Sequence, residues 1–349
     1  MMFTEFDLNK ISNSTKNIRV MVIGDYCLDS YYFINSAHDF KSDHTRLDTF
    51  CTKTRRISPG GAGNVVKNFL SLGANVYAVG VVGNDGSGME LVGELRRLGA
   101  DTSGLIVNDS INTPNYSRFI RDNVACNEIL FLNQECLDEE IIKQLGDVCE
   151  ERILSVDAVI VVEHFSGENA SGLIELLHAD IQKMSAENKD TVFLVDSKCR
   201  IQKYFNTYIK CNKHELIKSV LNIDTIDEAE SNYVNFDRVK SCVSALAKED
   251  TLFITMGEDG VLLFHEDTCK HIKSIPINQP IDTCGAGDSA TVGIIIGIVL
   301  GLGHEKAAML GNIISSITIK QLHCTGETDI NALISEIGHL HYIPNFSVI

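Results

Sequence analysis

Three small residues stand between two aspartates in the stretch DTCGAGDSATVG, residues 282–293. If Gly285, Ala286 and Gly287 begin a helix, their amides form a pocket of N–H donors aligned with the positive end of the helix dipole. Asp288 then lies in the first turn, where its carboxylate can accept a proton from an attacking hydroxyl. The stretch therefore indicates either a phosphoryl-transfer site or no more than a capped, glycine-rich turn.

The same glycines also fit the loose dinucleotide fingerprint Gly285-x-Gly287-x-x-Ala290. That fingerprint opens a βαβ unit whose second strand ends in an acidic residue about 20 positions further on. No such strand end is evident after residue 290. Chemistry with a nicotinamide cofactor is therefore disfavoured.

A second glycine-rich stretch, RISPGGAGNVVKN at residues 56–68, places Gly60 and Gly61 before another predicted helix. A glycine pair permits close approach of the backbone to a ligand and can act as a hinge. Asn64, in the first turn, offers a donor and an acceptor for a pair of sugar hydroxyls. A tight loop before a helix, with no ligand, is the alternative interpretation.

Carboxylates follow the first predicted strand in GDYCLD, where Asp25 and Asp29 either accept hydrogen bonds from a polyol or are simply solvated. The stretch CNKHE, residues 211–215, sets Asn212 and Glu215 three positions apart. On one helical turn this pair could hold a hydrated Mg²⁺, which takes few direct protein ligands, or it could only cap a helix.

A glycine-rich turn, TMGEDG at residues 255–260, closes another predicted strand and suits contact with a nucleotide phosphate. The chain contains no GxxxxGK[ST] loop and neither of the protein-kinase motifs HRD and DFG. Any phosphoryl transfer must therefore use different machinery.

Apolar strands and helices alternate along the chain and would bring these groups together. Strands are predicted within residues 18–29, 75–83, 158–165, 191–197 and 251–257, and helices within 63–74, 86–101 and 171–187. This alternation predicts an α/β protein with a mostly parallel sheet covered by helices on both faces. Ligands of such folds bind at the carboxyl edge of the sheet.

Two segments, at about residues 30–57 and 112–133, interrupt the alternation. Stretches such as YSRFIRD and NEILFLN alternate polar and apolar residues, which predicts half-exposed antiparallel strands. We expect both segments to form a small β-sheet lid over the carboxyl edge. The whole chain, residues 1–349, is then a single domain carrying this lid.

Composition excludes several partners. The net charge of −17 and the pI of about 5.0 argue against nucleic-acid binding. The longest apolar run, residues 290–303, is shorter than the roughly 20 residues that span a membrane. Eleven scattered cysteines without a CxxC pair, and an N-terminus unlike a secretory signal, predict a cytoplasmic protein with reduced thiols.

Taken in order, these motifs resemble those of the ribokinase-like (PfkB) family of carbohydrate kinases, over roughly residues 18–335. The stretch PGGAGNVVKNFLSLGANVYAVGVVGNDGSG is similar to the N-terminal motif of the family, and DTCGAGDSATVG is similar to its C-terminal motif. The resemblance implies the ribokinase-like fold with a β-sheet lid. It also implies ATP-dependent phosphorylation of a sugar hydroxyl.

The resemblance assigns roles to residues of this chain. Asp288 would be the catalytic base, Gly285, Ala286 and Gly287 the anion hole, and Asn212 and Glu215 the element that organises Mg²⁺ and phosphate. Thr255, Gly257 and Gly260 would line the ATP site, and Asp29, Gly60, Gly61 and Asn64 would grip the sugar. A homodimer through the lid and a monovalent cation near the loop are further expectations.

Within the family the chain is most similar to RfaE-type kinases, which phosphorylate D-glycero-D-manno-heptose 7-phosphate at the anomeric hydroxyl. Where that type reads Asp-Tyr-Gly-Lys-Gly, this chain has EHFSG, so Glu163 keeps the substrate-binding carboxylate and Ser166 replaces the lysine. Ser197 replaces the proline of Asp-Pro-Lys, while Asp196 and Lys198 remain, and Lys198 is assigned to the nucleotide.

These departures concern the sugar and leave the chemistry unchanged. The alternatives are a kinase for another sugar or sugar phosphate, such as a ribose- or fructose-phosphate-like acceptor, and a non-catalytic, sugar-sensing member of the family. The retained Asp288 argues for catalysis, because a protein that only binds sugar needs no base.

Overall fold

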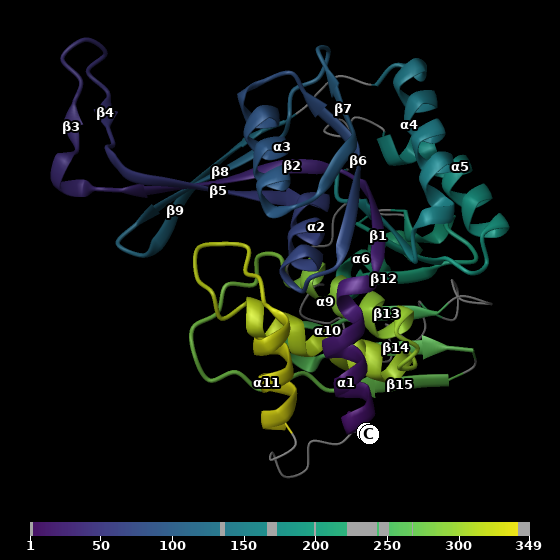
Figure 1. Ribbon diagram of the computed structural model, residues 1–349. Coiled ribbons are helices and arrows are strands. Elements are labelled where there is room, and N and C mark those ends of the chain that lie inside the picture. The colour runs from purple at the N-terminus through teal and green to yellow at the C-terminus, as the bar shows by residue number, and fades with distance from the viewer. Residues whose placement is uncertain are drawn as a thin grey trace.

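The computed structural model describes residues 3–132, 137–165, 173–198, 200–221, 243, 251–266 and 268–340. A nine-stranded sheet forms the centre of the molecule (Figure 1). In spatial order its strands are β15 (Thr268–Ile272), β14 (Val261–His265), β13 (Leu252–Thr255), β12 (Tyr208–Asn212), β11 (Val192–Ser197), β10 (Ala158–Glu163), β1 (Arg19–Gly24), β6 (Asn75–Gly83) and β7 (Asp101–Asn108).

All neighbouring strands from β7 to β13 are parallel, which confirms the predicted mostly parallel sheet. The last two strands at one side of the sheet, β14 and β15, pair antiparallel. The reason is the short connection between β13 and β14, because Gly260 adopts a φ of 91° and turns the chain straight back on itself. A connection of this length cannot make the crossover that a parallel strand needs.

Helices cover both faces of the sheet. Their bounds are α1 (Glu5–Ser14), α2 (Ala62–Ser71), α3 (Gly86–Leu98), α4 (Glu139–Arg152), α5 (Leu173–Glu187), α6 (Lys213–Leu221), α9 (Ala286–Val299), α10 (His304–Thr318) and α11 (Ile330–Leu340). Side chains of α2, α9, α10 and α11 share one apolar core with alternate residues of β1, β6 and β10. Side chains of α4 and α5 share a second core with the intervening residues. The strands are thus apolar on both faces, as buried parallel strands must be.

A second sheet of four strands forms the expected lid, in the order β5 (Thr52–Gly61), β2 (Tyr26–Ile34), β8 (Asn115–Arg121) and β9 (Val124–Phe131). Figure 1 shows these strands leaving the main sheet as an arm, with the two-residue strands β3 (Phe40–Lys41) and β4 (Asp48–Thr49) at its far end. Residue 133 of the predicted lid lies outside the described residues.

The expectation that all lid strands pair antiparallel was wrong for β2 and β8, which are parallel. Both strands run outward from the same edge of the main sheet, β2 directly after β1 and β8 after β7, so they point the same way. The other two pairs, β2–β5 and β8–β9, are antiparallel as predicted. Asp29 lies on β2, the strand that directly follows β1.

Candidate active site

A cavity of about 730 Å³ lies between the carboxyl edge of the main sheet and the lid. Most of the predicted site residues line it. These are Asp29, Gly61, Asn64, Lys198, Asn212, Glu215, Thr255, Gly257, Gly285, Ala286, Gly287 and Asp288. Segments far apart in the sequence therefore meet at one edge of the fold, as the strand–helix alternation predicts.

Asp288 lies in the first turn of α9, beside the amides of the glycine-rich loop. Gly285 caps the helix with a φ of 79°, a left-handed conformation that glycine adopts without steric cost. A Cβ atom at Gly285 would lie 2.5 Å from Asn64 Nδ2. Asn64 Nδ2 in turn donates a hydrogen bond of 2.7 Å to Asp288 Oδ2. The first turns of α2 and α9 thus meet at the carboxylate, and only glycine fits between them.

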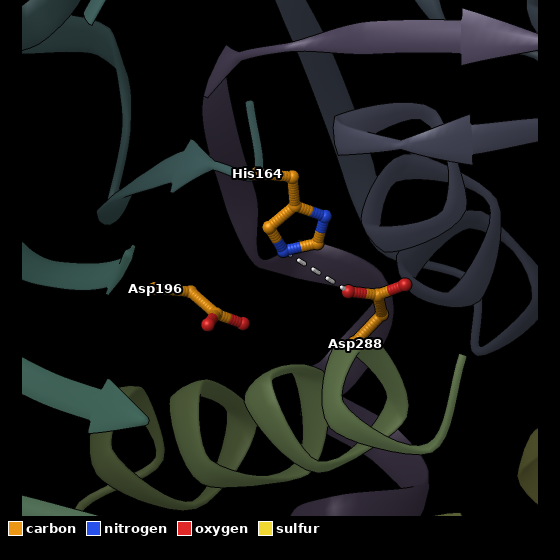
Figure 2. A group of neighbouring side chains, drawn as sticks. All are labelled: His164, Asp196 and Asp288. Atoms are coloured by element: carbon orange, nitrogen blue, oxygen red, sulfur yellow. Dashed lines mark ion pairs between the residues drawn. The ribbon is translucent and has the colours of Figure 1, made fainter. Parts of the chain in front are cut away.

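His164 lies on the other side of this carboxylate, with Nε2 3.7 Å from Asp288 Oδ1 (Figure 2). Burial, reinforced by the charge of Lys198, lowers the pKa of His164 to about 4. The imidazole is therefore neutral near pH 7, and the contact is not an ion pair. Our sequence analysis missed His164, although it belongs to the EHFSG stretch that we singled out. Ser166 of that stretch lies outside the described residues.

Asp196 completes the group drawn in Figure 2, and one potential ligand atom from each of Asp196, His164 and Asp288 lies within 4.8 Å of the others. Asp196 is already occupied, because its Oδ2 accepts hydrogen bonds from Lys210 Nζ at 2.8 Å and from Thr291 Oγ1 at 3.0 Å. A metal ion would have to compete with the Lys210 ammonium, so we assign none here. Lys210 lines the cavity, and the sequence analysis missed it.

The two aspartates after the first strand have different surroundings. Asp29 lines the cavity, and burial raises its pKa to about 7. Asp25 Oδ2 accepts hydrogen bonds from the backbone amides of His164 and Phe165, both at 2.9 Å. Asp25 is not among the residues that line the cavity, and it is buried rather than solvated. It fixes the turn that carries His164.

The other end of the cavity holds the predicted nucleotide residues. Asn212 Oδ1 accepts hydrogen bonds from the amides of His214 and Glu215, and Glu215 Oε2 accepts one from the amide of Asn212. The pair thus caps α6 reciprocally, as in a capping box. Burial raises the pKa of Glu215. Capping occupies only one oxygen of Glu215, and a carboxylate offers about four acceptor sites in all. The residues therefore fit a hydrated Mg²⁺ held through its waters.

Besides Asp25, three predicted site residues do not line the cavity. Gly60 lies against the Asp29 carboxylate and leaves room for it, because a Cβ atom there would lie 2.8 Å from Asp29 Oδ1. Gly260 makes the turn into β14. Glu163 is 1% exposed and accepts a hydrogen bond of 2.5 Å from Ser197 Oγ. Glu163 is the last residue of β10 and lies outside the cavity lining, whereas the next residue, His164, lines the cavity.

Residues 18–330 match the family model described as pfkB family carbohydrate kinase. The bifunctional protein HldE of Desulfatibacillum aliphaticivorans is 28% identical over 319 residues, which are 91% of this chain and 62% of that protein. HldE of Wolinella succinogenes is 26% identical over 316 residues, 89% of this chain and 63% of that protein. The chain thus spans less than two thirds of the length of these relatives.

Solved structures agree on the fold. The ribokinase of Arabidopsis thaliana, complexed with ribose and ATP, has a TM-score of 0.68 at 16% identity and covers 92% of this chain and 98% of its own. Phosphofructokinase-2 of Escherichia coli, in complex with potassium, has a TM-score of 0.65 at 17% identity and covers 93% and 99%.

Fold and site together define the ribokinase-like class of proteins. The chain belongs to the pfkB family of carbohydrate kinases. The predicted membership of a family of carbohydrate kinases is thereby confirmed, while the use of ATP by this chain stays a prediction. None of the helices described here is long and apolar enough to cross a membrane.

Proposed function

We propose that the protein transfers the γ-phosphoryl group of ATP to the anomeric hydroxyl of D-glycero-D-manno-heptose 7-phosphate. The observation that carries this proposal is the position of Asp288 in the first turn of α9, where it shares the cavity with Gly285, Ala286 and Gly287. A proton acceptor and a set of N–H donors facing one space suit in-line phosphoryl transfer. The choice of sugar rests on the resemblance to RfaE-type kinases.

In this proposal Asp288 accepts the proton of the sugar hydroxyl as the new O–P bond forms. The bond from the γ-phosphorus to the bridging oxygen breaks, and ADP leaves. The amides at the start of α9 stabilise the charge on the transferring phosphoryl oxygens. Asn64 orients the carboxylate through its hydrogen bond of 2.7 Å. Asp29 and Gly61 contact the sugar.

The nucleotide lies at the other end of the cavity, against Asn212, Thr255 and Gly257, with Lys198 as a further contact. A bound Mg²⁺ would supply positive charge to the phosphates. Glu215 and Asn212 are the residues that would hold it through its waters. A monovalent cation stays a prediction from the resemblance, and so does a cytoplasmic location.

A cation on the lid supports a phosphorylated acceptor. Arg118, on β8, lines the cavity, with its guanidinium 5.7 Å from the centre of the Tyr31 ring and 2.8 Å from Glu128. A guanidinium is well suited to a phosphate ester, which it can bind through two parallel hydrogen bonds. We therefore assign the 7-phosphate of the sugar to Arg118.

The experiment that tests the proposal is ATP-dependent release of ADP over a panel of sugars. The panel holds ribose, fructose, fructose 6-phosphate and D-glycero-D-manno-heptose 7-phosphate, with Asp288→Asn measured in parallel. We expect turnover on the heptose phosphate that the substitution abolishes. Turnover on another sugar would keep the mechanism and change the substrate. Sugar binding without turnover on any of them would favour the sugar-sensing alternative.

We also propose that two copies of the chain associate through the lid. β9 is an edge strand of the lid sheet and is exposed over its whole length, including the apolar Ile129, Leu130 and Phe131. An exposed apolar edge strand is a ready surface for pairing. Sedimentation should show a dimer that Leu130→Asp converts to a monomer. A monomeric wild type at micromolar concentration would contradict the proposal.

A further inference from the structure

Lys210 is a buried lysine whose ammonium lies against the start of α9. Along β12 the side chains of Ile209 and Cys211 enter an apolar core with α6, so Lys210 points to the opposite face. Asp196 is its register partner on β11 and points to the same face. The two side chains therefore meet in the interior, 5% and 1% exposed, with 2.8 Å between Lys210 Nζ and Asp196 Oδ2.

The ammonium touches the glycine-rich loop directly. A Cβ atom at Gly287 would lie 2.7 Å from Lys210 Nζ, so a side chain at this position would displace the lysine head. Lys210, Gly287 and Asp288 all line the same cavity. Lys210 therefore reaches the place where the amides of the loop would receive a phosphoryl group.

The charges around Lys210 keep it in the ammonium form. Burial alone would lower its pKa, but Asp196, Glu215 and Asp288 raise it above the ordinary value. These three carboxylates would repel a polyphosphate if no cation stood among them. An ammonium has three N–H donors, and Asp196 is the single hydrogen-bond partner found for it within the described part of the chain.

Stability alone does not account for such a pair. A buried ion pair is often no more stabilising than apolar side chains of the same size, because both charges lose their hydration. Apolar side chains fit this face of the sheet, since Leu194, two residues before Asp196 on β11, is fully buried. The position of the ammonium at the cavity wall instead favours a contact with a bound ligand.

We infer that Lys210 is a catalytic residue that donates hydrogen bonds to the transferring phosphoryl group, while Asp196 and Thr291 act as positioning residues that hold it against the amides of α9. The inference rests on the proposed binding of the phosphoryl group at these amides. Lys210 supplies positive charge where negative charge develops, from a side chain already oriented before the nucleotide arrives.

The first test is a pair of variants, Lys210→Met and the double variant Asp196→Asn with Lys210→Met. The single variant leaves the Asp196 charge buried and unpaired, so it will lower stability as well as activity. The double variant removes both charges and should regain much of the thermal stability. We expect kcat to remain about 10²–10³-fold below wild type in both, with the sugar KM within about threefold.

Recovery of wild-type kcat in the double variant would make the pair purely structural and would overturn the inference. The matched control is Lys306→Met, because Lys306 forms another short ion pair, 2.6 Å to Asp7, between α10 and α1. That variant should lose stability and keep its kcat. If Lys306→Met lowered kcat as much as Lys210→Met, the loss in Lys210→Met would not indicate a catalytic role.

The second test does not depend on the sugar or on turnover. If Lys210 contacts the γ-phosphoryl group, the double variant should bind the non-hydrolysable analogue AMP-PNP about tenfold more weakly and bind ADP within twofold of wild type. Equal losses for both nucleotides, or for neither, would overturn the inference. This result stands even if no sugar on the panel is turned over, so failure of the proposed function can be distinguished from failure of the inference.

Discussion

In the proposed mechanism Asp288 is the base, and its amide variant separates proton transfer from sugar binding. Asparagine keeps an oxygen that can accept the hydrogen bond from Asn64 Nδ2, so the site should retain its shape. It has no basic oxygen to take a proton. We expect Asp288→Asn to lower kcat by about 10²–10⁴-fold while sugar binding, measured by calorimetry, stays close to wild type. Comparable kcat in the two proteins would remove Asp288 from this role.

Arg118 carries a second prediction, about the choice of acceptor. Loss of one charge-assisted contact to a phosphate ester should cost about 1.5–3 kcal/mol of binding. Arg118→Met should therefore raise KM for the sugar phosphate at least about tenfold, and change kcat/KM for an unphosphorylated sugar little.

The matched control is Arg121→Met on the same strand. Arg121 pairs with Asp39 at 3.2 Å and is not among the residues that line the cavity. Arg121→Met should leave both sugars unaffected. Equal effects of Arg118→Met on the two sugars would mean that the guanidinium does not bind the phosphate.

The sequence could reveal those site residues that belong to a short, recognisable motif. Asp288 and Asn64 each follow a glycine pair at the start of a helix, a signal contained within a few residues. Lys210 and His164 have no such signal. Their positions depend on the register of β11 against β12 and on the hydrogen bonds from the 164–165 turn to Asp25, which no short stretch encodes.

At the scale of the element, the first turn of α9 depends on the backbone of Gly285. Alanine at this position would keep a φ near 79°, which costs a residue with a Cβ atom roughly 1–2 kcal/mol. The added methyl group would also press on Asn64 Nδ2, 2.5 Å away. We expect Gly285→Ala to lower kcat about 10²-fold or more, because Asn64 moves off the carboxylate.

Gly301, just past the other end of α9, is the control for backbone strain. It has a φ of 64°, and a Cβ atom there would meet nothing closer than Lys10 Nζ at 3.7 Å. Both alanine variants should therefore lose a similar amount of thermal stability, and only Gly285→Ala should lose activity. Full activity in Gly285→Ala would show that Asn64 does not need its present position.

The elements themselves were predictable where burial is uniform. β1, β6 and β10 are nearly continuous apolar runs, because helices cover both of their faces. β12 was missed, since a lysine occupies the centre of its five residues and reads as surface. The parallel pairing of β2 with β8 was missed for another reason. Strand direction in the lid is set by where each strand leaves the main sheet, and a polar–apolar alternation carries no such information.

At the scale of the whole molecule, buried carboxylates make the stability of the fold depend on pH. Burial raises the pKa of Asp25 to about 7, well above its ordinary value of 3.8. Between these two pH values the folded chain holds a proton on Asp25 that the unfolded chain releases. The free energy of unfolding therefore decreases as pH rises through this window, by at most about 1.4 kcal/mol per pH unit for one such group. Asp29 contributes in the same direction.

The variant Asp25→Asn isolates this effect. Its amide oxygen can still accept the hydrogen bonds from the amides of His164 and Phe165, and it has no charge to bury. We expect the wild type to lose more thermal stability than the variant between pH 5 and pH 8. Asp157→Asn is a control in which stability should depend on pH in the opposite direction. The ion pair with Arg19 lowers the pKa of Asp157 in the wild type, and the stabilisation that this pair provides is lost on acidification. If the thermal stability of wild type and of Asp25→Asn changed equally with pH, Asp25 would have the same pKa in the folded and the unfolded chain.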